Sequence, residues 1–459
     1  MHITFIEPTW NYDIHCMSEP LGMLYLSAVL RKAGHEVSLI HTLYKELDQE
    51  TLVNSDLIGF YSSTPQFDNT VALLKRVRVL APLVPVVIGG PHATTMPEDA
   101  LRAGFHAAFQ GEAEFSLLEF IENFANERPF ETRGISFLDD GKFVRNPPQR
   151  IYEDLDEIPF PARDLFDYKA YRDAGGWEYG IMGSRGCVHN CTFCQPTINN
   201  MFRHYRKRSA RNIALEIAGI LEKYDPPLLY FKDDTIASNG IEWFKTLKRE
   251  FASLGIKPPP WRCNNRVDMC GEKLIEAMVE AGCAQIALGV ESGSQRILDF
   301  YQKGVKVEDA IKAFETCRKF GIEPSANIII GAPIETKEDL EMTYDLLERL
   351  QPTNYWVFIL TALPCKQVTD YAKENNLLKP NAGYHLCDTA INGIRGETNF
   401  RHKYLTEHDL LEIRDRIFKR FPQRQYEMMM VYEKEGYVPT PKRVEEVIAK
   451  IKAKGNNNQ

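Results

Sequence analysis

The sequence of 459 residues contains no apolar run long enough to span a bilayer, and Met1 leads directly into a strand-like segment. We therefore expect neither a membrane span nor a secretory signal peptide. The sequence also lacks an excess of basic residues, since 55 Lys and Arg against 63 Asp and Glu give a formal charge of −8. This charge argues against a nucleic-acid or anionic-lipid partner.

The sequence also has too few cysteines for a disulfide framework, with ten in a chain of this length. Together with the expected lack of an export signal, this predicts a reducing, cytoplasmic location. A hydrophobic content of 44% and a charged content of 26% are typical of a globular protein. The length allows two or three domains, each with a full core.

Three of the cysteines lie within eight residues, at Cys187, Cys191 and Cys194, with the spacing C-x3-C-x2-C. They occupy a glycine-bearing loop that follows an apolar run. Thiolates at this density suit a soft metal or an iron–sulfur cluster. A structural zinc site is the alternative, but zinc needs a fourth ligand, and only His189 lies inside the loop.

This spacing, with Phe193 before the third cysteine, resembles the signature of the radical S-adenosylmethionine (radical SAM) enzymes. The resemblance implies a [4Fe–4S] cluster whose ligands are Cys187, Cys191 and Cys194. Three protein ligands leave one iron open, and the resemblance implies that S-adenosylmethionine chelates that iron.

Ahead of the motif, strand-like and helix-like segments alternate throughout residues 1–125. This alternation predicts an N-terminal doubly wound parallel sheet of the flavodoxin-like kind. We expect the helix after residues 62–65 to begin with a hydroxyl cap. In such sheets ligands bind beyond the carboxyl ends of the strands. Here those ends are residues 8–18, 62–66, 89–95 and 110–114.

Three short segments at these ends resemble the cobalamin-binding domain that precedes the catalytic core in one large class of radical SAM enzymes, class B. They are residues 19–22, residues 62–64 (Ser62, Ser63 and Thr64), and residues 89–92, which begin with Gly89 and Gly90. The resemblance implies hydroxyl contacts to the nucleotide tail of cobalamin and close backbone approach at the glycines. The alternative is the turn chemistry of any flavodoxin-like domain.

His15 is a candidate lower ligand of cobalt, because Asp13-Ile14-His15 resembles the start of the D-x-H-x-x-G motif of other cobalamin proteins. Ser18 stands where that motif has glycine, which leaves a loop histidine as the alternative.

Residues 126–177 are interpreted as a connector, with a hairpin turning at residues 139–141 and a proline-interrupted acidic segment that cannot form one helix. From residue 178 the alternation restarts, and six βα units predict a partial (β/α)6 barrel over residues 178–365. Expected strands are 178–183, 228–232, 259–264, 284–290, 325–330 and 355–361.

Residues 366–459 are expected to form a small, mainly helical C-terminal region. It has amphipathic helices at residues 405–421, capped by Thr406, and at residues 441–452. Met428, Met429 and Met430 are interpreted as core packing rather than as a soft-metal site.

Polar residues stand where the barrel strands are expected to end, which is where chemistry collects in such folds. By resemblance to the radical SAM class, six of them are candidate S-adenosylmethionine contacts. They are Asp233, Asp234, Asn264, Glu291, Ser292 and Asn327. For the two aspartates the alternative is a pair of solvated loop acids.

Over roughly residues 1–375 the chain resembles the cobalamin-dependent radical SAM enzymes, near the anaerobic magnesium-protoporphyrin ester cyclases. This implies a C-methyltransferase that removes hydrogen from an unactivated carbon of a small-molecule or natural-product substrate, with a flavodoxin or ferredoxin-type electron donor. A ring-forming or oxidative radical reaction without methyl transfer, and a non-catalytic cobalamin or redox sensor, are the alternatives. The sequence identifies neither the substrate nor a catalytic residue.

Overall fold

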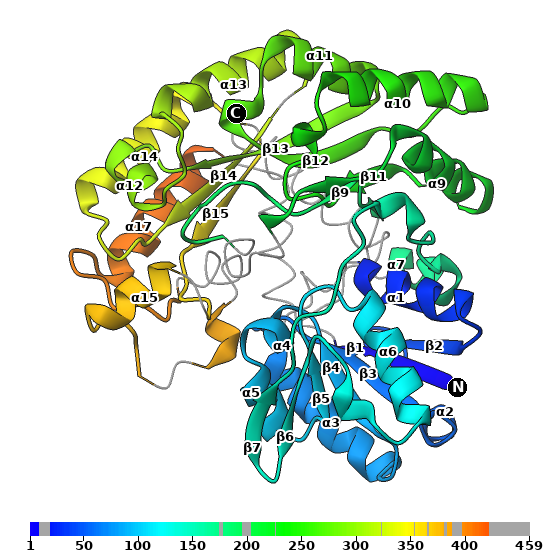
Figure 1. The fold of residues 1–459 in the computed structure, drawn as a ribbon. Helices are drawn as coiled ribbons and strands as arrows, with labels where there is room; N and C mark the ends of the chain where they lie inside the picture. The colour runs from blue at the N-terminus through cyan, green and yellow to red at the C-terminus, as the bar shows by residue number, and fades with distance from the viewer. Residues whose placement is uncertain are drawn as a thin grey trace. The chain divides into compact units, whose positions relative to one another are not determined.

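The computed structural model describes residues 1–8, 19–173, 178–194, 203–224, 226–322, 324–352, 354–364, 367–380, 383–387 and 397–421. The chain divides into two compact units, Met1–Gly176 and Trp177–Gln459, which are drawn in Figure 1. Each unit contains one large sheet.

The sheet of the first unit has the strand order β2-β1-β3-β4-β5-β6-β7. Its parallel part consists of β1 (His2–Glu7), β2 (Glu36–His41), β3 (Leu57–Tyr61), β4 (Val86–Gly89) and β5 (Ala107–Phe109). The predicted hairpin is present as β6 (Ile135–Asp139) and β7 (Lys142–Arg145). Because β6 pairs antiparallel with β5, the hairpin extends the first sheet. The predicted doubly wound fold is confirmed.

Helices follow the parallel strands, as right-handed crossovers require. They are α1 (Leu21–Lys32), α2 (Gln49–Val53), α3 (Phe67–Leu80), α4 (Pro91–Thr95), α5 (Pro97–Arg102) and α6 (Glu114–Ala125). Beyond the hairpin come short turns and α7 (Tyr168–Asp173), so residues 154–164 form no single helix, as predicted.

The predicted hydroxyl cap of the helix after β3 is wrong. Helix α3 begins at Phe67, and its N-cap residue is Gln66, which makes no capping hydrogen bond through its side chain. The hydroxyls before it have other partners: Ser63 Oγ donates to Gln66 Oε1 at 2.6 Å, and Ser62 Oγ lies 2.9 Å from Thr70 Oγ1. These contacts brace the turn instead of capping the helix.

An ion pair joins the start of α1 to the segment near the end of the first unit. The carboxylate of Glu19, before α1, accepts hydrogen bonds from the Arg163 guanidinium and the Tyr168 hydroxyl. Both ionised side chains are buried, at 7% and 0% exposure. Removing one partner of such a pair costs far more than the pair itself contributes, so these residues hold the segment around Arg163 to the start of α1.

The sheet of the second unit has six parallel strands in the order β15-β14-β13-β12-β11-β8. They are β8 (Glu178–Ile181), β11 (Leu228–Phe231), β12 (Trp261–Arg266), β13 (Cys283–Glu291), β14 (Ser325–Ile330) and β15 (Tyr355–Ile359). A short antiparallel ladder of β9 (Ser184–Arg185) and β10 (Arg206–Lys207) lies between β8 and the first helix. The partial (β/α)6 barrel is confirmed.

The helices of this unit follow one side of the curved sheet (Figure 1). They include α9 (Ala210–Lys223), α10 (Ile241–Leu254), α11 (Glu272–Glu280), α12 (Gln295–Phe300), α13 (Val307–Lys319) and α14 (Lys337–Leu350). Strand residues that face them are apolar and buried, such as Leu229, Trp261 and Ile328. Their neighbours in sequence, such as Tyr230, Arg262 and Asn327, point to the other face and are partly exposed. The alternation of side chains thus gives the sheet one polar face.

Beyond the barrel the chain forms α15 (Gln367–Glu374) and α17 (Glu407–Arg420). Thr406 caps α17 in a capping box with Asp409, as predicted. The hydroxyl of Tyr355 in β15 donates to the carbonyl of Phe421 at 2.6 Å, so α17 is anchored to the barrel. The expected helix 441–452 and Met428, Met429 and Met430 lie outside the described residues. No helix in the described part of the chain is long and apolar enough to cross a membrane.

Candidate functional site

The cysteine loop begins at the carboxyl end of β8 and is held by the segment that follows α12. The backbone N–H of Thr192 donates to the carbonyl of Tyr301 at 2.9 Å, and its hydroxyl donates to the carbonyl of Phe300 at 3.2 Å. Gly186, directly before the first cysteine, has φ of 90°, which a residue with a Cβ rarely adopts. Cys187 and Cys191 are buried, and Cys194 is partly exposed.

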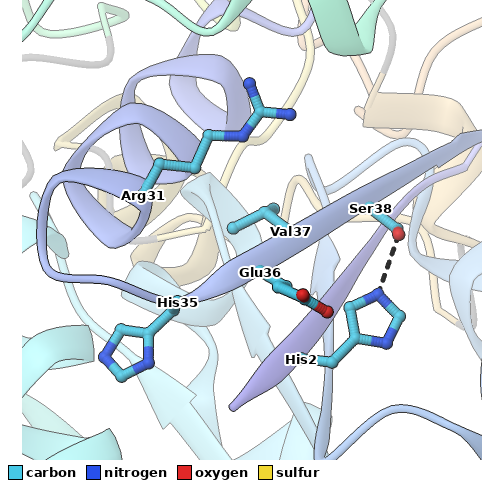
Figure 2. A pocket seen from close by; sticks show the side chains of 6 residues that line it. All are labelled: His2, Arg31, His35, Glu36, Val37 and Ser38. Carbon is cyan, nitrogen blue, oxygen red and sulfur yellow. Dashed lines mark hydrogen bonds between the residues drawn. The ribbon is translucent and has the colours of Figure 1, made fainter.

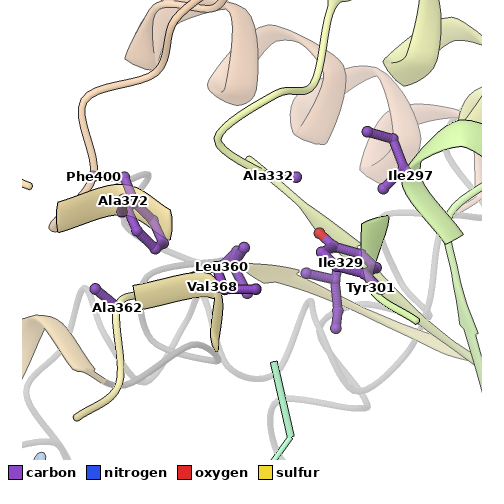
Figure 3. Close-up of a cluster of buried hydrophobic side chains, with 9 residues drawn as sticks. All are labelled: Ile297, Tyr301, Ile329, Ala332, Leu360, Ala362, Val368, Ala372 and Phe400. Carbon is purple, nitrogen blue, oxygen red and sulfur yellow. The ribbon is translucent and has the colours of Figure 1, made fainter. Parts of the chain in front are cut away.

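An apolar cluster, drawn in Figure 3, packs against Phe193 of this loop. The ring of Phe193 meets that of Tyr301 edge-on at 4.9 Å between centroids, and packs against the cluster. The cluster's buried members are Ile297, Tyr301, Ile329, Ala332, Leu360, Ala362, Val368, Ala372 and Phe400. The aromatic residue before the third cysteine therefore fixes the loop to the barrel.

A guanidinium stands beside the thiols. Arg266, the last residue of β12, donates through Nη1 to Cys191 Sγ at 3.5 Å and through Nη2 to the carbonyl of Lys303 at 2.6 Å. Burial raises the pKa of the Cys187 thiol, so metal binding there must displace a proton. Three soft donors next to a buried cation fit an anionic iron–sulfur cluster. In the described part of the chain, no three His, Cys, Asp or Glu side chains are grouped around a point where one ion could sit.

Asp233 and Asp234, after β11, have different surroundings. Asp233 is 3% exposed, and its carboxylate accepts hydrogen bonds from the N–H of Gly183 at 3.0 Å and from the Ser184 hydroxyl. Burial raises the pKa of Asp233 to about 7. Asp234 is exposed. Asp233 therefore holds the start of the cysteine loop and is not a solvated acid, while the Asp234 side chain is accessible to a ligand.

Asn264 lies on the polar face of the barrel sheet. Its amide donates to the hydroxyl of Tyr230 at 2.7 Å. The guanidinium of Arg262 lies over the Tyr230 ring at 3.8 Å from its centroid and pairs with Glu178. These residues come from three neighbouring strands and form one polar layer. Of this layer, the sequence predicts only Asn264 as a site residue.

Glu291, at the end of β13, forms a buried ion pair with Lys303 at 2.5 Å, with side-chain exposures of 8% and 6%. Glu291 has φ of 63°, and a Cβ added to Gly289 would lie 2.5 Å from its Oε1 and 2.7 Å from Lys303 Nζ. The adjacent Ser292 is fully buried, with its hydroxyl 3.2 Å from Thr343 Oγ1. Ser292 thus contacts α14, and Glu291 contacts the segment that holds the cysteine loop.

Asn327 lies on the polar face of β14, and the structure gives its buried Oδ1 no hydrogen-bond partner. Beyond it, the fully buried Glu335 accepts the N–H groups of Gly331 and Ala332 at 2.5 and 2.9 Å. Burial raises the pKa of Glu335 to about 8. The sequence analysis did not identify Glu335. The signal for it is an acidic residue four positions after Gly331, which can accept the backbone N–H groups of the turn.

In the first unit the predicted cobalamin residues lie together at the carboxyl ends of β3 and β4. The Ser62 N–H donates to the Gly89 carbonyl at 3.0 Å. Gly90 has φ of 95°, and a Cβ there would lie 2.8 Å from the Ser62 carbonyl, so glycine is required. Ser62 and Thr64 are buried, whereas Ser63 is partly exposed. His15 lies outside the described residues.

A cavity of about 380 Å³ in the first unit lies away from this edge (Figure 2). It is lined by His2, Arg31, His35, Glu36, Val37 and Ser38, at the amino ends of β1 and β2. Arg31 pairs with Asp164 at 2.7 Å, and His2 Nε2 lies 2.8 Å from Ser38 Oγ. Arg31, His2 and Ser38 are thus engaged with the protein, and the predicted ligand edge lies at the opposite ends of the strands.

Comparison with known proteins identifies both units. Residues 181–347 match the radical SAM superfamily, and residues 15–121 match the B12 binding domain. An uncharacterized methyltransferase of Pyrococcus horikoshii is 31% identical over 372 residues, which cover 78% of this chain and 79% of the relative. The anaerobic magnesium-protoporphyrin IX monomethyl ester cyclase of Rubrivivax gelatinosus is 27% identical, with 77% and 66% covered.

Among solved structures, the radical S-adenosylmethionine methyltransferase TsrM of Kitasatospora setae, with cobalamin and a [4Fe–4S] cluster bound, has a similar fold. Its TM-score is 0.71 at 17% identity, over 82% of this chain and 75% of that one. The chain belongs to the radical SAM enzymes that carry a B12-binding domain. Its cofactors are accordingly a [4Fe–4S] cluster, S-adenosylmethionine and cobalamin.

Proposed function

We propose that this enzyme methylates a carbon atom of a small-molecule substrate. The observation that carries the proposal is the C-x3-C-x2-C loop, fixed at the carboxyl end of β8 beside a buried guanidinium, in a chain that also has a B12-binding domain. The names of two similar proteins, the Pyrococcus methyltransferase and TsrM, support methyl transfer. A TsrM structure contains tryptophan, which supports a small-molecule substrate.

We assign Cys187, Cys191 and Cys194 as the cluster ligands. When bound, the cluster and S-adenosylmethionine supply a radical that removes hydrogen from carbon, and cobalamin supplies the methyl group. The chain's own contribution is to hold three thiolates in a loop fixed by Thr192 and Phe193 and placed beside the cation of Arg266.

For S-adenosylmethionine we assign Asp234, Asn264, Glu291 and Asn327 as contacts. The Asp234 carboxylate suits the amino group of the cofactor, because an ammonium and a carboxylate form charge-assisted hydrogen bonds. The buried Asn327 Oδ1 without a partner is an acceptor that a bound ligand can satisfy. Asp233 and Ser292 stay candidate contacts from the sequence, and their hydrogen bonds to Gly183 and Thr343 favour a supporting role for both.

For cobalamin we assign the edge formed by Ser62, Ser63, Thr64, Gly89 and Gly90. Gly90 lets the chain turn tightly at this edge, because its φ of 95° and the nearby Ser62 carbonyl exclude a side chain there. The proposal keeps His15 as a candidate lower ligand. A visible spectrum of protein purified with cobalamin tests this assignment, and replacing His15 with alanine should shift the spectrum only if its imidazole binds cobalt.

The second candidate function is a ring-forming or oxidative radical reaction, which the similarity to the Rubrivivax cyclase favours. The two candidates differ in their products. Methyl transfer yields a methylated product together with 5′-deoxyadenosine and S-adenosylhomocysteine, whereas the alternative yields 5′-deoxyadenosine without S-adenosylhomocysteine or methylation.

The deciding experiment is anaerobic reconstitution with a reductant and methyl-labelled S-adenosylmethionine, followed by product analysis against a cell extract. Label in an organic product supports methyl transfer. Accumulation of 5′-deoxyadenosine while label reaches no acceptor would refute it and favour the second candidate.

A parallel test concerns the cluster ligands. Replacing Cys187, Cys191 and Cys194 together with alanine should abolish the visible absorbance of the reconstituted cluster. Cys317→Ala, at a buried cysteine of α13, is the matched control and should retain it. A triple variant with the spectrum of the unmodified protein would overturn the assignment.

The proposal includes a one-electron donor of the flavodoxin or ferredoxin type and a cytoplasmic location, where a reducing environment preserves thiols. Adding either donor in place of a chemical reductant, with turnover as the readout, tests the first point.

A further inference from the structure

Arg266 has one guanidinium nitrogen aimed at a proposed cluster ligand, while its other two nitrogens are held by other partners. Its Nε and Nη2 donate to the carboxylate of Asp268, both at 2.9 Å, and Nη2 also donates to the carbonyl of Lys303 at 2.6 Å. Nη1 remains, and it lies 3.5 Å from Cys191 Sγ. The orientation of Nη1 toward the sulfur is therefore imposed by the other two contacts.

This contact joins parts of the chain that are 75 residues apart, and it is shielded from water. The Arg266 side chain is 7% exposed, and Cys191 is 7% exposed. In such surroundings a charge-assisted hydrogen bond is stronger than at the surface, because water neither screens it nor competes for the donor.

We propose that Arg266 is a positioning residue that makes the cluster easier to reduce, by donating an N–H···S hydrogen bond to Cys191. The inference rests on the proposed function, which makes Cys191 a cluster ligand. Hydrogen bonds to ligand sulfurs and local net charge are among the factors that set the potential of iron–sulfur clusters.

The direction of the effect follows from charge. Reduction adds one negative charge to a cluster that already carries thiolates, so a nearby cation and donor stabilise the reduced form more than the oxidised form. Loss of Arg266 must then lower the reduction potential. Asp268, which pairs with the same guanidinium, lies on the solvent side and is exposed, so it offsets the cation only in part.

The experiment is a redox titration of the reconstituted full-length protein, followed by electron paramagnetic resonance, with iron and sulfide quantified in each sample. Arg266→Met should lower the equilibrium constant for reduction at least tenfold, which is about 59 mV for a one-electron couple. Arg266→Lys keeps a cation and a donor and should recover part of this shift.

Arg262→Met is the matched control. Arg262 lies on the same strand, but its guanidinium contacts Tyr230 and Glu178 instead of a cluster ligand. It should leave the potential unchanged. A merely structural role for Arg266 predicts less cluster per protein but the same potential in the molecules that hold one.

Three outcomes overturn the inference: an unchanged potential in Arg266→Met, an equal shift in Arg262→Met, or no cluster in any Arg266 variant while Arg262→Met holds one. In the last case the guanidinium is needed for assembly of the cluster and does not set its reduction potential. Failure of the proposed function is a different result, because the unmodified protein would then hold no cluster, or the triple cysteine variant would still hold one.

Discussion

Replacing Asp233 with alanine removes an acceptor that two buried donors share, the Gly183 N–H and the Ser184 hydroxyl. A buried donor without a partner costs about 1–3 kcal/mol, so the two together cost about 2–6 kcal/mol. Urea unfolding of the full chain measures this loss as a lower transition midpoint for the barrel unit.

Asp234→Ala is the matched control, because Asp234 is the next residue and is exposed. The free energy of unfolding of this variant should differ from that of the unmodified protein by at most about 0.5 kcal/mol. The substitution should instead weaken S-adenosylmethionine binding to the reconstituted protein, measured by equilibrium dialysis. A loss below about 1 kcal/mol in Asp233→Ala, or equal losses in the two variants, would refute the distinction between a supporting and a ligand-binding aspartate.

Three further predictions concern the barrel. Gly293→Ala should destabilise strongly in thermal unfolding, because a Cβ there overlaps the α14 backbone, whereas Gly219→Ala, with open space in α9, should stabilise by about 1 kcal/mol. Lys303→Met should cost about 3–5 kcal/mol in urea, because it leaves Glu291 buried and unpaired, and adding Glu291→Leu should recover most of that loss. Glu335→Gln should flatten the pH dependence of stability, since the folded-state pKa of Glu335 is raised from 4.5 to about 8 by burial.

The sign of the last effect follows from proton binding. Between pH 4.5 and about 8 the folded state keeps a proton on Glu335 that the unfolded state releases, so stability falls as pH rises through this window. Each unit of pKa difference is worth about 1.4 kcal/mol. Equal slopes of stability against pH in Glu335→Gln and the unmodified protein would contradict the Glu335 prediction. An unchanged melting temperature in Gly293→Ala would contradict the predicted backbone overlap. A double variant no more stable than Lys303→Met alone would contradict the prediction for the buried ion pair.

The fold was largely predictable from the sequence because its signals are local. Strand and helix periods alternate in both halves, and the cysteine spacing is read within eight residues. The predicted cap at Ser62 to Thr64 failed because hydroxyls there have tertiary partners, including Thr70. The preference of serine and threonine for turns correctly predicts a turn at these residues. It does not predict which groups their hydroxyls bond to.

The contacts that define the site are not local, which is why sequence reasoning missed several of them. Arg266 and Cys191 are 75 residues apart, and Arg266 and Lys303 are 37 apart. They meet only once the barrel is assembled, because Arg266 ends β12 while Cys191 and Lys303 lie in loops. Glu19 and Arg163 are likewise distant in sequence, 144 residues apart. Their pairing ties the segment around Arg163, expected to be part of a connector, to the start of α1.

The burial of the cysteines has a consequence for chemical labelling. Among the eight cysteines that the structure describes, seven are buried, and Cys194 alone is partly accessible to solvent. Among these eight, a brief pulse of a small alkylating reagent on the native apo protein should therefore modify Cys194 first, because the reagent needs both access and a thiolate. A thiolate bound to iron is protected. The alkylated fraction at Cys194, measured by peptide mass spectrometry, then counts the molecules in a preparation whose loop is empty.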